Sequence, residues 1–280
     1  MVMKILTLDE YSQIEFINLL NKVFEDYTVP IKWNVVSFQL DARENSISLS
    51  DSFIFLKDNK PFGFIVISIR KERARIDAMG VIREERGTGA ASYILEHSIN
   101  YLKWRGIKKI QLEVVKDDLR AFKFYEKHGF REKRLLHSMN LENPKSFSVK
   151  YKHISVESRT VYTQALEIYF SGRKLNWQRE PISLLLSDGR YNFEKIITDE
   201  SEGYLVWGKS DNENVYIIDI GTKDDWNKIT KASVQYLTNT TKCKNILISA
   251  VPEDDELFKS LKNLGFKPFL IQSEMEKELT

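Results

Sequence analysis

Apolar residues recur along the first half of the chain with two different periods, and the change of period predicts its elements. Residues 11–27 have the three-to-four-residue spacing of an amphipathic helix, with an inward stripe at Ile14, Ile17, Leu19, Leu20 and Val23. Pro30 breaks the pattern, and a second helix is predicted over residues 34–41. Residues 52–70 hold two apolar runs around a polar turn, which predicts a β-hairpin.

Strand and helix patterns then alternate. Residues 74–82 and 108–115 predict strands, and residues 119–130 predict a helix that ends at Gly129. Residues 132–141 predict a closing strand. Between the first two strands, residues 88–104 predict a helix whose inward positions are Ala91, Ile94, Leu95, Ser98, Ile99 and Leu102.

This order of elements predicts an α+β or mixed α/β fold. We expect a twisted, mostly antiparallel sheet with a central parallel strand pair and helices on both faces. The second half repeats the end of the first, since residues 110–130 align without gaps with residues 246–266. Residues 203–221 resemble the hairpin and strand that come before. Two unrelated strand–turn–helix units are the alternative, but we predict two tandem domains of one fold, at residues 1–145 and 150–280.

Composition and charge narrow the class of protein. The single cysteine, Cys243, excludes an intramolecular disulfide and a Cys-based zinc site, and it fits a reducing compartment. We expect a cytoplasmic protein, because the N-terminus turns acidic too soon for a signal peptide and no apolar run approaches the roughly 18 residues of a membrane span. Residues 1–150 carry a net charge of +5, too small an excess to argue for nucleic acid. The four histidines do not cluster, so no metal is inferred.

The stretch REERGTGAASYIL, residues 83–95, places two glycines at the start of a predicted helix. Glycine inside a helix costs about 1 kcal/mol relative to alanine, so two glycines in three residues indicate a need for bare backbone. The N–H groups from Gly87 to Ala91 could hold an anion such as a pyrophosphate, with Arg86 adding a charged contact. A P-loop lysine and the third glycine of a dinucleotide fingerprint are both missing. A small-residue helix start required only for packing is the alternative.

Residues 1–143 resemble the Gcn5-related N-acetyltransferases (GNAT). The pyrophosphate loop of that family, Arg/Gln-x-x-Gly-x-Gly/Ala, matches residues 86–91 after the strand IDAMGVI. The segment LEVVKDDLRAFKFYEKHGF resembles the family's Leu-Glu-Val…Asn-x-x-Ala…Tyr-x-x-x-Gly-Phe. The resemblance implies an N-acetyltransferase that moves an acetyl group from acetyl-CoA directly to a primary amine of a small molecule, a peptide N-terminus or a lysine. The alternative is a non-catalytic acyl-CoA-binding or regulatory module.

The same resemblance implies where the coenzyme binds. In members of the family, the strand before the loop separates from the next strand, which leaves a slot for the acetyl group. The backbone of the strand before the loop contacts the pantetheine arm. Asp118 stands where the family usually has Asn, and it is equally well interpreted as the N-cap of the helix beginning at Leu119. The expected coenzyme contacts are Met79, Gly80, Val81, Arg86, Gly87, Thr88, Gly89, Ala90, Ala91, Asp118 and Tyr125.

Catalytic and acceptor residues are also implied. Tyr125 matches the family's tyrosine, whose hydroxyl gives a proton to the leaving sulfur, and the N–H of Val81 is a candidate donor to the developing oxyanion. Glu113 matches the base of some peptide-terminus acetylating members, with Asp77 as its rival and water as a third possibility. The segment FEDYTVPI resembles the family's acceptor-side loop, so the expected acceptor contacts are Tyr27, Pro30 and Trp33.

The second copy has lost these features. Tyr125 aligns with Leu261 and Glu113 with Ser249, while the glycine loop aligns with residues 222–227, TKDDWN. Asp224 and Asp225 would repel phosphates there. We therefore predict a second domain that binds no coenzyme and instead helps to wall the acceptor site. The protein would then be a monomer with pseudo-dimeric domains, or a homodimer.

Overall fold

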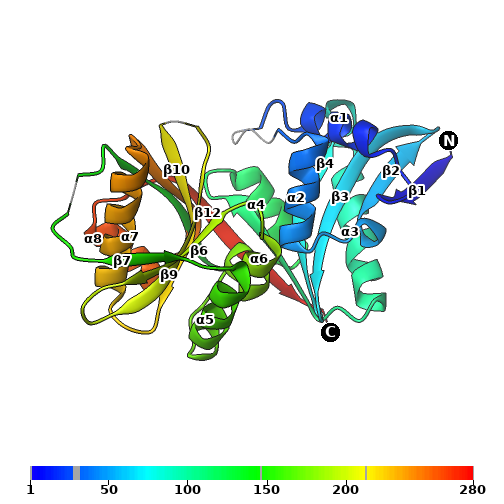
Figure 1. Cartoon of the computed structure of the whole chain (residues 1–280). Helices are drawn as coiled ribbons and strands as arrows, with labels where there is room; N and C mark the ends of the chain where they lie inside the picture. The colour runs from blue at the N-terminus through cyan, green and yellow to red at the C-terminus, as the bar shows by residue number, and fades with distance from the viewer. Residues whose placement is uncertain (1, 28–31, 146, 212, 280) are drawn as a thin grey trace. The chain divides into compact units, whose positions relative to one another are not determined.

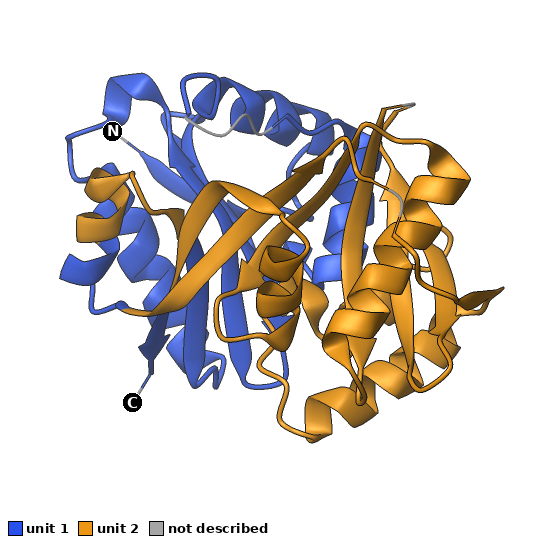
Figure 2. Cartoon of the chain, turned by 90° about the vertical axis from the view of Figure 1, so that its left-hand side faces the viewer, with its two compact units in different colours: residues 1–113, 125–131, 275–280 blue, residues 114–124, 132–274 orange. Residues whose placement is uncertain are grey.

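The structure, a computed structural model, describes residues 2–27, 32–145, 147–211 and 213–279, and it divides into two compact units (Figures 1 and 2). Unit 1 comprises residues 1–113, 125–131 and 275–280, and unit 2 comprises residues 114–124 and 132–274. Each unit therefore takes short pieces of chain from the sequence range of the other. The predicted boundary near residues 145–150 stays a prediction.

Unit 1 has a sheet with the strand order β1-β2-β3-β4-β5. All neighbouring strands in it are antiparallel except β4 and β5, which are parallel. Its elements are β1 (Met3–Thr7), α1 (Gln13–Val23), α2 (Val35–Asn45), β2 (Phe53–Lys57), β3 (Lys60–Arg70), β4 (Arg73–Val81), α3 (Ala90–Trp104) and most of β5 (Lys109–Val115).

The two faces of this sheet are covered by different helices. Phe64 and Val66 of β3 pack with α1 and α2 around Phe16 and Phe38. Gly63, the neighbour of Phe64, faces α3, because a Cβ built on it would lie 2.5 Å from Ile94. Successive residues of a strand point to opposite faces, so α3 covers the face opposite α1 and α2.

The predicted inward stripe of α1 is wrong at one position. Ile14 is 65% exposed, whereas Phe16, which the prediction omitted, is fully buried. At about 100° per residue, Ile14 lies roughly 150° from the centre of the buried face. In α3, Ile94, Leu95, Ser98 and Leu102 are buried as predicted, and Ala91 and Ile99 are half-buried.

Unit 2 repeats this architecture. Its strands run in the order β12-β6-β11-β10-β9-β8-β7, and the β10–β11 pair is parallel. Its elements are the start of α4 (Leu119–Lys127), then β6 (Arg131–Glu142), β7 (Lys152–Ser155), α5 (Ser158–Phe170), α6 (Pro181–Leu186), β8 (Asn192–Ile197), β9 (Glu202–Lys209), β10 (Asn214–Thr222), α7 (Trp226–Thr241), β11 (Asn245–Pro252), α8 (Glu256–Asn263) and most of β12 (Lys267–Glu278).

The internal repeat extends to single residues. The helices α4 and α8 both end at a glycine with positive φ, Gly129 at 84° and Gly265 at 91°. The parallel pairing of β4 with β5 ends at Ile76 and Leu112, and that of β10 with β11 ends at the equivalent Ile217 and Ile248. Both central strand pairs therefore separate at the same point. The predicted mixed α/β fold, with a central parallel pair in each half, is confirmed.

Candidate functional site

The glycine-rich stretch forms an exposed turn between β4 and α3. Gly87 and Gly89 have φ of +81° and +94°, which side-chain-bearing residues rarely adopt, and a Cβ added to either would meet nothing within 4 Å. Gly89 is the N-cap of α3 and supplies no side-chain cap. Thr88 holds the turn in place by donating from Oγ1 to the carbonyl oxygen of Glu85 at 2.8 Å.

The amides of this turn lack a protein acceptor. Within the described ranges, nothing accepts a hydrogen bond from the N–H groups of residues 87–91. A hollow of about 330 Å³, lined by Thr88, Gly89, Ala90 and Tyr93 among others, borders them. An uncapped helix N-terminus with several free N–H groups is suited to bind an anion. The residues present thus fit a pyrophosphate group.

Arg86 is held by protein groups. Its guanidinium donates to Asp26 at 2.8 Å and to the carbonyl oxygens of Val23 and Val81 at 3.0 and 3.3 Å. The hydrogen bonds from Arg86 and Arg83 lower the pKa of Asp26. The Arg86 side chain therefore fastens the end of α1 to the turn. The charged contact to a phosphate that we expected from it stays a prediction.

The separation of β4 from β5 exposes part of the β4 backbone. Ile82 donates its N–H to Phe62 on β3, and in an antiparallel ladder alternate residues turn to the same neighbour. Gly80 thus turns its backbone groups to β3, while Met79 and Val81 turn theirs to the side where β5 has parted. Gly80 has a packing role as well, because a Cβ there would lie 2.4 Å from Val23.

Two carboxylates lie where the strands part. Asp77 and Glu113 directly follow the last paired residues of β4 and β5, and their side chains are only 8% and 10% exposed. Arg75 forms ion pairs with both, at 3.2 Å to Asp77 and 3.6 Å to Glu113. Ser68 also donates a hydrogen bond to Asp77. Burial raises the pKa of Asp77, and Glu113 adds to the rise, while Arg75 and Ser68 oppose it.

The other two predicted side chains belong to α4. Tyr125 is half-buried, with its ring edge-on to Phe130 at 5.7 Å between centroids. Asp118 accepts a hydrogen bond from the N–H of Ala121 at 2.9 Å, which is the geometry of a helix N-cap. Of the two interpretations left open for Asp118, the capping contact is present; its contact with a coenzyme stays a prediction.

The expected acceptor segment is described in part. Tyr27 is half-buried against Phe24, with ring centroids 5.5 Å apart. Trp33 donates its ring N–H to Asp41 at 2.8 Å, and its backbone N–H and carbonyl both bond the side chain of Asn21. Trp33 therefore anchors the start of α2 to α1. Pro30 lies outside the described residues.

In unit 2, the turn equivalent to the glycine loop is capped from within. Asp225 accepts the N–H of Lys228 at 3.0 Å, so it is the N-cap of α7. Asp224 accepts the N–H of Glu202 at 2.9 Å. Asp225 thus occupies the helix N-terminus whose equivalent is uncapped in unit 1, with the Asp224 carboxylate next to it in sequence.

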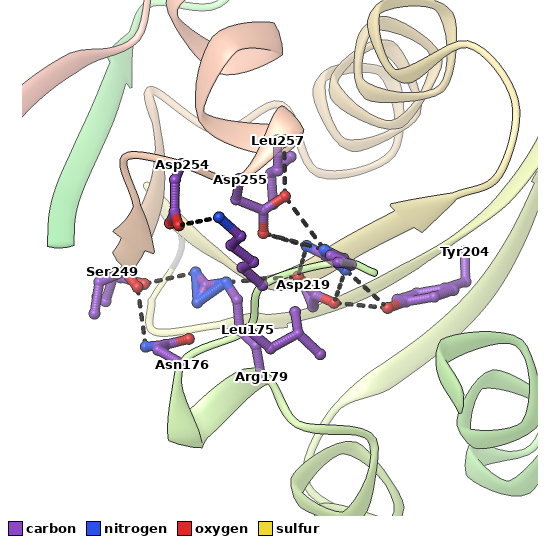
Figure 3. A network of polar contacts seen from close by, with 12 residues as sticks. Leu175, Asn176, Arg179, Tyr204, Asp219, Ser249, Asp254, Asp255 and Leu257 are labelled. Carbon is purple, nitrogen blue, oxygen red and sulfur yellow. Dashed lines mark hydrogen bonds and ion pairs between the residues drawn. The ribbon is translucent and has the colours of Figure 1, made fainter. Parts of the chain in front are cut away.

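The strand separation in unit 2 is filled by the segment 171–180 of the same unit, which we call the plug (Figure 3). Asn176 donates to the carbonyl oxygen of Ala250 at 3.0 Å, and Arg179 donates to that of Ser249 at 2.6 Å. Both carbonyls follow directly after the last paired residue of β11. Ala250 has a φ of +51°, unusual for a residue with a side chain.

A buried ionic network fixes the base of the plug (Figure 3). Arg173 bonds both oxygens of Asp219 at 2.9 Å, and it pairs with Asp255 at 3.0 Å. Tyr204 donates its hydroxyl to Asp219 at 2.7 Å. Burial alone would lower the pKa of Arg173, but Asp219 and Asp255 raise it well above the usual value. The network therefore keeps Arg173 charged.

The structure brings together the loop, the strand separation and Glu113, all within unit 1. The sequence analysis missed Arg75, Ser68 and the plug residues. A signal for the strand residues was available in the sequence. Polar residues stand at every second position of otherwise apolar strands, at Ser68 and Arg70 and again at Arg75 and Asp77. Within the residues the structure describes, no group of His, Cys, Asp or Glu could hold a metal ion, and no helix is long and apolar enough to cross a membrane.

Comparison with known proteins identifies the family of the first half. Residues 15–130 match the model of the acetyltransferase (GNAT) family. The chain is 32% identical over 90 residues to N-alpha-acetyltransferase 30 of Schizosaccharomyces pombe, and 32% identical over 78 residues to the uncharacterized protein YxbD of Bacillus subtilis. These matches cover 60% and 48% of the two relatives and 30% and 28% of this chain. Residues 15–130 are a GNAT domain.

Solved structures extend the likeness of fold to the whole chain. A tandem GNAT protein from the clavulanic acid biosynthesis pathway matches with a TM-score of 0.70 at 12% identity, over 99% of this chain and 98% of that one. A GCN5-related N-acetyltransferase from Sphaerobacter thermophilus matches with a TM-score of 0.68 at 12% identity, over 99% and 95%. The tandem arrangement of two GNAT-like folds is thus confirmed.

Proposed function

We propose that unit 1 moves an acetyl group from acetyl-CoA directly to a primary amine. The observation that carries this proposal is the row of unpaired amides at residues 87–91, held open by two glycines in a conformation other residues avoid. The match of residues 15–130 to the GNAT family and the likeness to an N-alpha-acetyltransferase support it. The amine itself can be a small molecule, a peptide N-terminus or a lysine.

Backbone groups of the glycine loop and of β4 would hold the coenzyme. The N–H groups of residues 87–91 take the pyrophosphate, and the backbone groups of Met79 and Val81 contact the pantetheine arm where β4 leaves β5. The bound coenzyme supplies the acyl group as an activated thioester. A helix N-terminus carries about half a positive charge, which favours the diphosphate over neutral ligands.

Side chains would carry out the proton transfers of the reaction. Glu113 or Asp77 takes the proton that the amine must lose before its lone pair can attack. Tyr125 gives a proton to the sulfur that departs when the carbon–sulfur bond breaks. The N–H of Val81 donates to the oxygen on which negative charge develops. The nitrogen loses two protons, one before it attacks and one as the amide forms, while the sulfur gains one, so each cycle releases one proton to water and proton exchange with water restores the side chains.

The C-terminal half, in this proposal, binds no coenzyme. Asp225 caps the helix where phosphates would sit, Asp224 lies beside it, and Asn176 and Arg179 occupy the equivalent slot. Acetyl transfer therefore takes place in unit 1 alone, with one coenzyme for each chain.

The rival function is a non-catalytic acyl-CoA-binding module. The two are distinguished by thiol release from acetyl-CoA with a panel of amines, comparing the native protein with Tyr125→Phe. An enzyme releases thiol with at least one amine, and removal of its general acid lowers kcat by about 10²-fold. Tyr101→Phe is the matched control, because it also removes one hydroxyl, which bonds Asp51 instead. Coenzyme binding without thiol release would favour the binding module.

A further inference from the structure

Arg75 is placed to control the two carboxylates at the strand separation. It lies on β4 two residues before Asp77, and its partner in the parallel register is Gln111, two residues before Glu113. Its side chain is 11% exposed and spans both acids, with one terminal nitrogen toward each. We propose that Arg75 positions the Glu113 carboxylate so that it can accept the proton of the acceptor amine, a role that rests on the acetyl-transfer function proposed above.

Two arginines lie near this pair of acids. Arg70 on β3 bonds the Ser46 hydroxyl at 3.2 Å and the carbonyl oxygen of Glu44 at 3.0 Å. Arg70 thus ties β3 to the end of α2. Arg75 is the cation that forms ion pairs with both Asp77 and Glu113.

Removing Arg75 would leave two nearly buried carboxylates as neighbours. Burial and Glu113 already raise the pKa of Asp77, and Arg75 is the largest influence that lowers it. Two like charges at one site favour protonation of at least one of them. A protonated acid cannot accept a proton from an ammonium group, so the loss of Arg75 should reduce the fraction of enzyme in which both acids are ionised and restore it as the pH rises.

The sign of the pH effect follows from that equilibrium. A base must be deprotonated to act, so the rate falls on the acid side of its pKa. Arg75→Met should therefore shift the acid limb of the kcat/KM profile to higher pH by about one unit or more, which lowers the rate by about tenfold at pH values below the limb. Arg75→Lys keeps the charge and should shift the limb less. The coenzyme Kd should stay within about twofold of the native value, because the amides of residues 87–91 are untouched.

A double-mutant test separates this role from a structural one. If Arg75 acts through Glu113, adding Glu113→Gln to Arg75→Met should cost less than the product of the two single losses. Arg105→Met is the matched control, since Arg105 also pairs with a buried acid, Asp51 at 3.1 Å, and it should leave the acid limb in place. Measuring Arg75→Lys beside Arg75→Met keeps the test informative if the methionine variant folds poorly.

The possible results are distinct. A shifted acid limb with non-additive losses supports the role of Arg75. An unshifted limb in both Arg75 variants, or losses that multiply fully, overturns it while leaving acetyl transfer intact. If the native protein transfers acetyl to no amine of the panel, the proposed function fails and the role of Arg75 fails with it.

Discussion

At the scale of single residues, Gly89 connects the sequence motif to the proposed chemistry most directly. Its φ of +94° lies in the left-handed region, and the space beside it is empty. A side chain there would strain the backbone and also project toward the amides that we assign to the pyrophosphate. The glycine thus serves both the turn and the ligand.

Gly89→Val should weaken coenzyme A binding at least tenfold, as measured by calorimetry. The matched control is Gly106→Val at the other end of α3, where φ is +82° and a Cβ likewise meets nothing within 4 Å. Both substitutions cost about 1–2 kcal/mol of backbone strain, so they should lower the free energy of unfolding by similar amounts. Equal coenzyme affinity in the two variants would show that this turn does not bind the coenzyme.

At the scale of elements, the N-termini of α3 and α7 occupy equivalent positions in the two units but differ in their capping. The first is open, and the second is capped by Asp225, with Asp224 beside it. The strand separation that follows is open to a ligand in our proposal for unit 1, and in unit 2 it is filled by the plug. Two independent obstacles therefore oppose a second coenzyme site.

The double variant Asp224→Gly/Asp225→Gly should still bind one equivalent of coenzyme A. It removes the two acids from the helix start, but Asn176 and Arg179 still occupy the carbonyls of β11. The loss of the Asp225 cap should also lower the free energy of unfolding by a few tenths of a kcal/mol, since glycine is itself a tolerated cap. Binding of a second equivalent of coenzyme A with comparable affinity in a calorimetric titration would show that the plug does not prevent coenzyme binding in unit 2.

Periodicity was enough to predict most elements of the first half, because each depends mainly on local sequence, but β1 at Met3–Thr7 was missed. The error at Ile14 arose because consecutive apolar residues on α1 allow more than one stripe, and only packing against β3 selects Phe16. The glycine loop could be predicted because its motif is also contained in a short stretch of sequence. The pairing of Arg75 with Glu113 and the contacts of the plug could not be predicted, since these partners come from other elements and, for Arg179 and Ser249, lie 70 residues away. Polar residues at alternate strand positions indicate a site but do not identify such long-range partners.

At the scale of the whole molecule, the units do not coincide with the two sequence repeats. The last residues of the chain, from Met275, belong to unit 1. There, Leu279 donates its N–H to the carbonyl oxygen of Lys108 at 2.7 Å, and Lys109 forms ion pairs with Glu276 and Glu278 at 3.4 and 2.7 Å. These contacts lie along β5, whose Ile110 and Leu112 are buried. The proposed catalytic unit is therefore incomplete without the C-terminus of the chain.

A fragment of residues 1–145 should consequently be less stable than the intact chain and bind coenzyme A at least tenfold more weakly. It keeps the whole glycine loop, but β5, which carries Glu113, loses the contacts that residues 276–279 make with it and becomes more exposed along that edge. Urea unfolding and calorimetry measure the two effects. A peptide of residues 267–280 added in trans should raise the unfolding midpoint of the fragment, whereas a peptide of the same composition in scrambled order should not. A fragment that unfolds at the midpoint of the full chain with unchanged coenzyme affinity would show that residues 1–145 form an autonomous domain, because the missing strand would then contribute nothing to the site.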